Sequence, residues 1–195
     1  MKKIIITIAR EYGSGGRKIG KIVADTLGID FYDKEIISLS AKKTGFSEEF
    51  IRQNDERRVG SLIYDIYFQR YAPSVFEQAS YAISGVLKDI ADKGSCVIVG
   101  RAADSVLKDY DNCLNVFIHA PIEYRMERVK NEYGVETQNY RKYIEKIDKE
   151  RAAFYNFSSE GKWGDMRNYH LTLSSAAGEE AAAEAIVSYA KRMMG

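Results

Sequence analysis

A glycine-rich segment with two adjacent cations lies near the start of the chain, where residues 13–18 read Gly-Ser-Gly-Gly-Arg-Lys. Glycines let backbone N–H groups approach an anion without side-chain clash, and the start of a helix favours negative charge. We therefore interpret the segment as a phosphate-binding loop. A tight strand-to-helix turn without a ligand is the alternative. The expected phosphate-binding residues are Gly13, Ser14, Gly15, Gly16, Arg17 and Lys18, with Ser14 as the candidate Mg²⁺ ligand.

The segment matches the loop pattern G-x-x-x-x-G-K-[ST] only in part. If Gly15 is the second glycine, Gly16 stands at the lysine position and Arg10 at the first glycine position. If Gly16 is the second glycine, Arg17 stands at the lysine position and Lys18 at the Ser/Thr position. In both registers the Ser/Thr that usually holds Mg²⁺ is missing, so we expect Mg²⁺ to be held mostly by phosphates and water.

Two charged residues follow apolar runs that are typical of buried strands. Arg101 comes directly after the run at 96–99, and we interpret it as a functional residue. Asp33 follows a shorter run at 29–32. It is a candidate acceptor ligand, a ligand for Mg²⁺-bound water or the N-cap of the next helix.

Three further arginines lie in segments with helical patterns. Arg125 and Arg128 are three residues apart and so share one face of a helix. They are candidates for phosphate binding, since a guanidinium grips two oxygens and stays charged. Surface pairing with neighbouring glutamates is the alternative. Arg151 lies in a long polar helical segment, close to Asp148.

Elements that position these side chains alternate between strand and helix, which predicts an α/β fold with a parallel sheet. Ligands of such sheets bind at the carboxyl ends of the strands, where the glycine loop and Arg101 lie. Expected strands cover 4–9, 29–32, 96–99, 114–118 and 169–173. Expected helices cover 19–27, parts of 38–93 including an aromatic stripe at 63–71, a segment opened by Pro121, 137–155 and 178–194.

Length and composition agree with one globular domain of 195 residues. The formal net charge of +1 argues against nucleic acid and membranes as partners, because no overall field would attract a polyanion. The apolar runs are too short to span a bilayer or to act as a signal peptide. Two cysteines are too few for a disulfide framework. These features predict a cytoplasmic protein that is a monomer or a homodimer.

Several segments resemble, in order, the cytidylate kinase-like family. They are the opening strand with its glycine loop, Phe31-Tyr32-Asp33, Val99-Gly100-Arg101, the stretch from Phe117 to Arg128 with its E-x-R-x-x-R, and Asp148-Lys149-Glu150-Arg151. The resemblance covers nearly the whole chain. The chain departs from the family at Val99, where the family has an aspartate, and near Leu39 and Ile144, where the family has arginines.

The resemblance implies a three-layer P-loop kinase that uses ATP and Mg²⁺ and phosphorylates CMP or dCMP. By the same resemblance, Arg101 holds the acceptor phosphate, Asp148 contacts the acceptor sugar or positions the lid, and Arg125, Arg128 and Arg151 meet phosphates as the lid closes. Together with Arg17 and Lys18 of the loop, these three arginines are the candidate catalytic residues. The resemblance also implies one kinase domain with a core of 1–38, 94–136 and 169–195, an acceptor-binding insert at 39–93 and a lid at 137–168. Two alternatives stay open: a kinase of the same fold with another small acceptor, such as a shikimate-like alcohol, and a catalytically weakened nucleotide-binding regulator.

Overall fold

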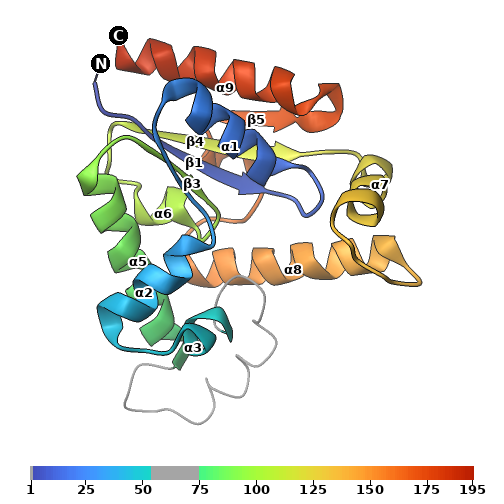
Figure 1. Ribbon diagram of the computed structural model, residues 1–195, viewed down its shortest axis with the longest axis horizontal. Helices are drawn as coiled ribbons and strands as arrows, with labels where there is room; N and C mark the ends of the chain where they lie inside the picture. The colour runs from blue at the N-terminus through green and yellow to red at the C-terminus, as the bar shows by residue number, and fades with distance from the viewer. Residues whose placement is uncertain (1, 54–74) are drawn as a thin grey trace.

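A computed structural model describes residues 2–53 and 75–195 of the chain (Figure 1). Its centre is a five-stranded parallel sheet in the order β2-β3-β1-β4-β5. The predicted α/β class with a parallel sheet is therefore confirmed. The strands are β1 (Ile5–Arg10), β2 (Asp30–Tyr32), β3 (Cys96–Val99), β4 (Cys113–His119) and β5 (Leu171–Ser174).

Helices cover both faces of the sheet, so the protein has three layers (Figure 1). Helices α1 and α9 lie on one face, and α2, α5, α6 and α8 lie on the other. The described helices are α1 (Gly16–Leu27), α2 (Glu35–Thr44), α3 (Glu48–Gln53), α5 (Val75–Lys93), α6 (Ala103–Val106), α7 (Ile122–Glu132), α8 (Tyr140–Ser158) and α9 (Glu179–Met194). Two short 3₁₀ turns, Met166–Asn168 and Ser175–Ala177, flank β5.

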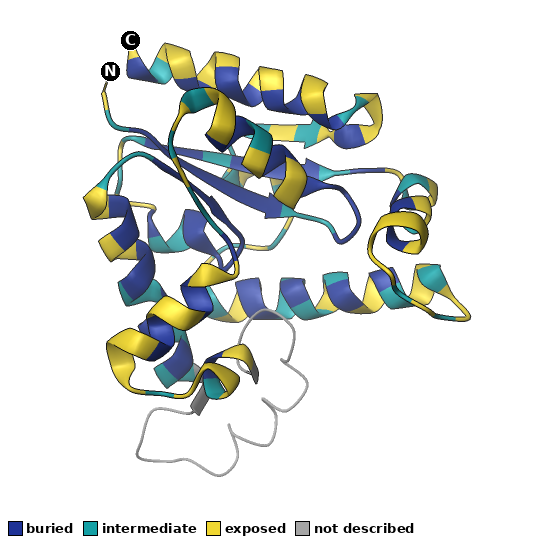
Figure 2. Ribbon diagram, viewed as in Figure 1, coloured by how far each residue is buried: buried dark blue, intermediate teal, exposed yellow. Residues whose placement is uncertain are grey.

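Strand β1 forms the centre of two apolar cores because its side chains alternate between the faces of the sheet. Ile6 and Ile8, with the preceding Ile4, pack into the core that includes α1 and α9. Ile5 packs into the core formed with α2 and α5. The same division is visible along the outer helices, which are buried on one side and exposed on the other (Figure 2).

Local signals in the sequence explain several helix boundaries. The Ser47 hydroxyl accepts from the Phe50 N–H at 3.1 Å, so Ser47 caps the start of α3. Pro121 precedes the first residue of α7. The helix expected around 63–71 lies outside the described residues. No helix within the described ranges is long and apolar enough to cross a membrane.

Both cysteines are buried free thiols. Cys96 starts β3 and Cys113 starts β4, on either side of β1 in the sheet. Burial raises the pKa of each thiol to about 12. They therefore stay protonated near neutral pH and serve packing rather than chemistry.

Candidate active site

The glycine loop joins the end of β1 to the start of α1, at the carboxyl edge of the central strand (Figure 1). Gly13 and Gly15 have φ angles of 82° and 80°, a left-handed conformation that favours glycine. Among the described residues, the backbone N–H groups of Gly13, Gly15 and Gly16 have no hydrogen-bond partner. The loop thus offers amide donors at a helix start, which is the arrangement that binds phosphate.

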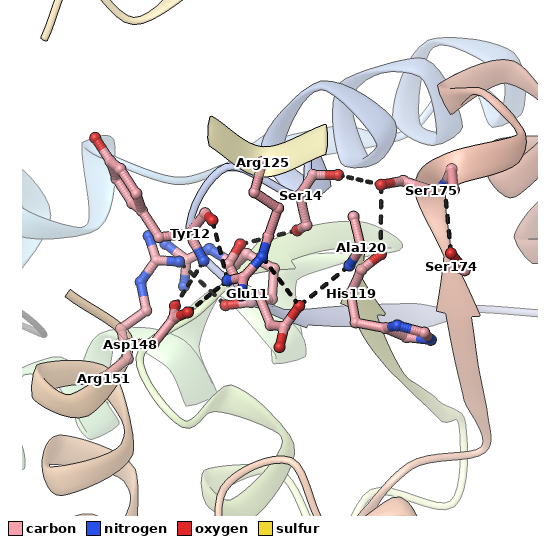
Figure 3. Close-up of polar contacts among 12 residues, drawn as sticks. Glu11, Tyr12, Ser14, His119, Ala120, Arg125, Asp148, Arg151, Ser174 and Ser175 are labelled. Carbon is pink, nitrogen blue, oxygen red and sulfur yellow. Dashed lines mark hydrogen bonds and ion pairs between the residues drawn. The ribbon is translucent and has the colours of Figure 1, made fainter. Parts of the chain in front are cut away.

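Ser14 lies inside the loop but its hydroxyl is used within the protein. It is fully buried, and its Oγ donates to the Glu11 carbonyl at 2.8 Å. The Ser14 carbonyl accepts from the Ser175 hydroxyl at 2.6 Å, which fastens the loop to the turn after β5 (Figure 3). Ser14 therefore shapes the loop, and its part in Mg²⁺ binding stays a prediction.

Helix α7 rests directly on the two left-handed glycines of the loop. A Cβ atom on Gly13 would lie 2.9 Å from the Arg125 carbonyl oxygen, and one on Gly15 would overlap the guanidinium of Arg128. Glycine is required at both positions by the backbone angle and by this close approach. The approach brings the two arginines of α7 against the loop.

Arg125 is buried and joins the loop to α8. Its Nη1 forms an ion pair with Asp148 Oδ2 at 2.5 Å and donates to the Tyr12 carbonyl at 3.3 Å (Figure 3). The other Asp148 oxygen accepts from the Tyr12 N–H at 2.7 Å. Glu11 Oε2 lies 3.5 Å from Arg125 Nε and accepts from the Ala120 N–H. One arginine thereby ties together the loop, the end of β4 and α8.

Arg128 lies beside the loop with unused hydrogen-bonding capacity. Its Nη2 pairs with Glu179 Oε1 at 2.5 Å, and Lys18 Nζ pairs with the other oxygen of the same carboxylate at 2.8 Å. Arg128 Nε and Nη1 are buried and donate no hydrogen bond to any of the described residues, although Nε lies 3.6 Å from Glu132 Oε1. A buried guanidinium with open donors is costly unless an anion completes it, so Arg128 is a candidate phosphate ligand.

Arg151 reaches the base of the loop from α8. Its Nη1 donates to the Arg10 carbonyl at 3.1 Å, and its guanidinium lies 5.3 Å from the centre of the Tyr12 ring. Arg101, Arg125, Arg128 and Arg151 are each at most 8% exposed. Arginine is rarely buried to this extent away from a partner or site, so the loop is surrounded by a concentration of buried positive charge.

A second ion-pair cluster lies at the ends of β2 and β3. Asp33 accepts from Arg101 Nη1 at 2.8 Å and from Arg17 Nε at 2.6 Å. Burial alone would raise the pKa of Asp33, but the charge and hydrogen bond of Arg101, helped by Arg17, bring it below its ordinary value. Asp33 is not a side-chain cap of α2, whose N-cap is Lys34. The acceptor and Mg²⁺-water interpretations of Asp33 stay predictions.

The backbone at Arg101 is strained. Gly100, Arg101 and Ala102 all have positive φ, at 79°, 57° and 50°. A left-handed conformation costs a residue other than glycine about 1–2 kcal/mol. Such strain is concentrated at functional sites, and here it turns the Arg101 side chain back to Asp33 and to the Val99 carbonyl.

Sequence reasoning missed two acidic residues of the site. Glu11 lies in the loop itself, where its position between β1 and the glycines was a usable signal. Glu179 lies at the start of α9, and only the fold brings it to Lys18 and Arg128.

Trp163 packs edge-on against Phe117 of β4, with ring centres 5.4 Å apart.

The fold and this loop define the class of protein: a P-loop protein of the kinase type. The sequence pattern of the cytidylate kinase-like family matches residues 5–177, so the chain belongs to this family. A search among curated proteins gives no match.

Solved structures agree with this assignment of the fold. An uncharacterised protein from Eubacterium ventriosum ATCC 27560 is 27% identical, with a TM-score of 0.73 over 97% of this chain and 99% of the other. Shikimate kinase from Acinetobacter baumannii is 18% identical, with a TM-score of 0.55 over 96% and 93%. A gluconokinase from Sinorhizobium meliloti 1021 is 15% identical, with a TM-score of 0.58 over 98% and 94%. These two kinases share the fold of this chain.

Proposed function

We propose that the protein is an ATP-dependent phosphotransferase that phosphorylates a nucleoside monophosphate, CMP or dCMP, to the diphosphate. The observation that carries this proposal is the glycine loop, in which the amide N–H groups of Gly13, Gly15 and Gly16 and two donors of Arg128 have no hydrogen-bond partner within residues 2–53 and 75–195. Phosphoryl transfer depends on positioning and charge neutralisation, and amides with arginines supply both.

The loop residues fit a triphosphate, because open donors on the backbone and on Arg128 are what phosphate oxygens satisfy. The fit to Mg²⁺ is narrower. The loop has no free Ser/Thr hydroxyl, and Asp33 is held by two arginines. We therefore expect Mg²⁺ to arrive with the nucleotide, bound by phosphate oxygens and water.

The acceptor side is proposed to lie at the second ion-pair cluster. Arg101 is buried, strained and directed to the carboxyl ends of β2 and β3, next to the loop. A monophosphate would exchange for the Asp33 carboxylate on Arg101, since both are oxygen anions that accept from a guanidinium. The expected role of Asp148 at the acceptor is weaker, because Asp148 is bound to Arg125 and Tyr12.

A kinase with another small acceptor is the second candidate, and Ile144 favours it. The family has an arginine near this position, but Ile144 is fully buried in the apolar cluster with Tyr12 and Val129. The acceptor phosphate would then meet fewer cations than the family pattern provides. The fold is shared with shikimate kinase and gluconokinase, whose acceptors we include in the test.

Coupled measurement of ADP release tests the proposal, with Mg·ATP and a panel of CMP, dCMP, UMP, AMP, shikimate and gluconate. CMP and dCMP are expected to raise the rate well above the ATP-only background. Arg101→Ala should lower that rate by more than about tenfold, and Lys21→Ala, on the outer side of α1, should leave it unchanged. Turnover with shikimate or gluconate alone would support the second candidate. ATP binding without turnover on any acceptor would support a regulatory protein.

A further inference from the structure

Arg10 and Gly16 face each other across the glycine loop. Arg10 ends β1 and Gly16 begins α1. A Cβ atom on Gly16 would lie 2.7 Å from the Cβ and 3.1 Å from the Cγ of Arg10. Because the backbone fixes the position of a Cβ atom, neither group can rotate away. The two positions cannot both carry a side chain unless the backbone shifts.

The loop pattern G-x-x-x-x-G-K-[ST] assigns its first glycine and its lysine to these two positions. Gly15 is left-handed and immediately precedes α1, so it is the second glycine of the pattern. Position 10 is then the first glycine and position 16 the lysine. In the usual pattern, the residue at the end of the strand is a glycine without a side chain, and the lysine is at the start of the helix. This chain has the reverse arrangement.

We propose that Arg10 replaces the loop lysine, entering from the end of β1 and binding the β- and γ-phosphate oxygens of ATP. This inference rests on the proposed function and names the residue that completes its phosphate site. A guanidinium in this place stays charged and grips two oxygens, so it can neutralise the transferred group as a lysine does.

The surroundings of Arg10 agree with this role. Its backbone is fixed by the bond from Arg151 Nη1 to its carbonyl. Its side chain is half-buried and lines a narrow cavity with Gly100, Ala102 and Trp163, between the ends of β1 and β3. Its charge also contributes to the low pKa of Asp33, so its field extends to the expected acceptor side.

The other two candidates for the role are directed away from the position of the loop lysine. Arg17 Nε binds Asp33 and Lys18 Nζ binds Glu179, and both side chains are more than half exposed. Arg17 is therefore directed to the ends of β2 and β3, and Lys18 to α9. The side chain of Arg10, by contrast, starts within 2.7 Å of the point where the side chain of a lysine at position 16 would start.

An exchange of the two side chains tests the inference. Isothermal calorimetry with Mg·ATP should show at least about tenfold weaker binding for R10G than for the wild-type protein. Arg10→Lys should lose less. The double variant R10G/G16K restores the usual arrangement and should recover affinity to within about threefold. G16K alone should be less stable to heat than the double variant, because its lysine meets Arg10.

Lys21→Ala removes one charge from the far side of α1 and should leave Mg·ATP affinity unchanged. Thermal unfolding of each variant identifies any loss that is due to misfolding. If the wild-type protein binds Mg·ATP and folded R10G binds equally well, the inference is overturned and the proposed function stands. A folded double variant that stays as weak as R10G would also overturn it. If the wild-type protein does not bind Mg·ATP, the proposed function itself fails.

Discussion

A side chain at position 15 and the guanidinium of Arg128 exclude each other, because a Cβ atom on Gly15 would overlap Arg128 Nη1. The glycine of the loop is thus matched to a residue more than a hundred positions later in the chain. The match brings open arginine donors to the start of α1, where the loop amides lie.

Gly15→Ala is expected to damage the loop more than the backbone angle alone explains. Gly28 is the matched control, since it too is left-handed, at φ 65°, but has open space where a Cβ would be. Gly15→Ala should cost about 1–3 kcal/mol more unfolding free energy than Gly28→Ala, because it adds steric overlap to strain. It should also weaken Mg·ATP binding by at least about tenfold, with Gly28→Ala near wild type. Urea unfolding and calorimetry measure both effects; equal losses in the two variants would contradict the packing argument.

Arg128 and Glu179 should be strongly coupled in stability. Both side chains are less than a tenth exposed, so removing one leaves the other charge buried without its partner. A double-mutant cycle of Arg128→Ala and Glu179→Gln should give a coupling of about 2–4 kcal/mol. The cycle of Lys18→Ala with Glu179→Gln is the comparison. Lys18 is 58% exposed, and its coupling should stay below about 1 kcal/mol.

Arg101 and Arg17 bind the same carboxylate but should differ in their contribution to stability. Arg101 is 5% exposed and Arg17 is 59% exposed, while Asp33 is buried. Arg101→Ala is expected to lower the unfolding free energy by about 2–3 kcal/mol, because the other hydrogen-bond donor to Asp33, Arg17, is exposed to solvent. Arg17→Ala should cost less than about 1 kcal/mol. Similar losses in urea unfolding would show that burial does not decide the strength of this pair.

The pair also predicts how stability depends on pH. The folded-state pKa of Asp33 lies below its ordinary value, so the folded protein binds this proton less readily than the unfolded chain. The stabilisation is present above the unfolded pKa of about 4 and is lost as the pH falls through the folded pKa.

Comparison of the wild-type protein with Asp33→Asn isolates this contribution. The difference in their unfolding free energies should be constant above about pH 5 and shrink below about pH 4. Chemical unfolding at a series of pH values measures it. A difference that grows as the pH falls would contradict the assignment of the lowered pKa to Asp33.

Local patterns in the sequence predict the strand–loop–helix unit at 5–27, since β-branched runs and glycines act within a few residues. The order of the strands is a different matter. Asp33 and Arg101 meet because β2 and β3 are neighbours, which no local pattern states. The pairing considered for Arg128 with a neighbouring glutamate is present, since Glu132 lies 3.6 Å away, but its closer carboxylate, Glu179, comes from α9, which no local pattern indicates.

A glycine in this sequence can indicate either that the backbone approaches a ligand or that another part of the chain packs against it. Only the fold distinguishes these two roles. The loop glycines were interpreted as places where backbone approaches an anion. The structure adds that Gly13 and Gly15 also make room for α7, and Gly16 for Arg10. The expected roles of the site arginines, the lid at 137–168 and the cytoplasmic location remain predictions.

Because α7 packs directly against the glycine loop, a fluorophore attached to this helix is expected to report changes at the loop. Glu127 lies on the exposed side of α7, one residue before Arg128. The chain's own thiols, Cys96 and Cys113, are 1% and 4% exposed, so a cysteine introduced at position 127 would take up a fluorophore selectively. We expect a dye at that position to report occupancy of the loop, because it would be one residue away from Arg128.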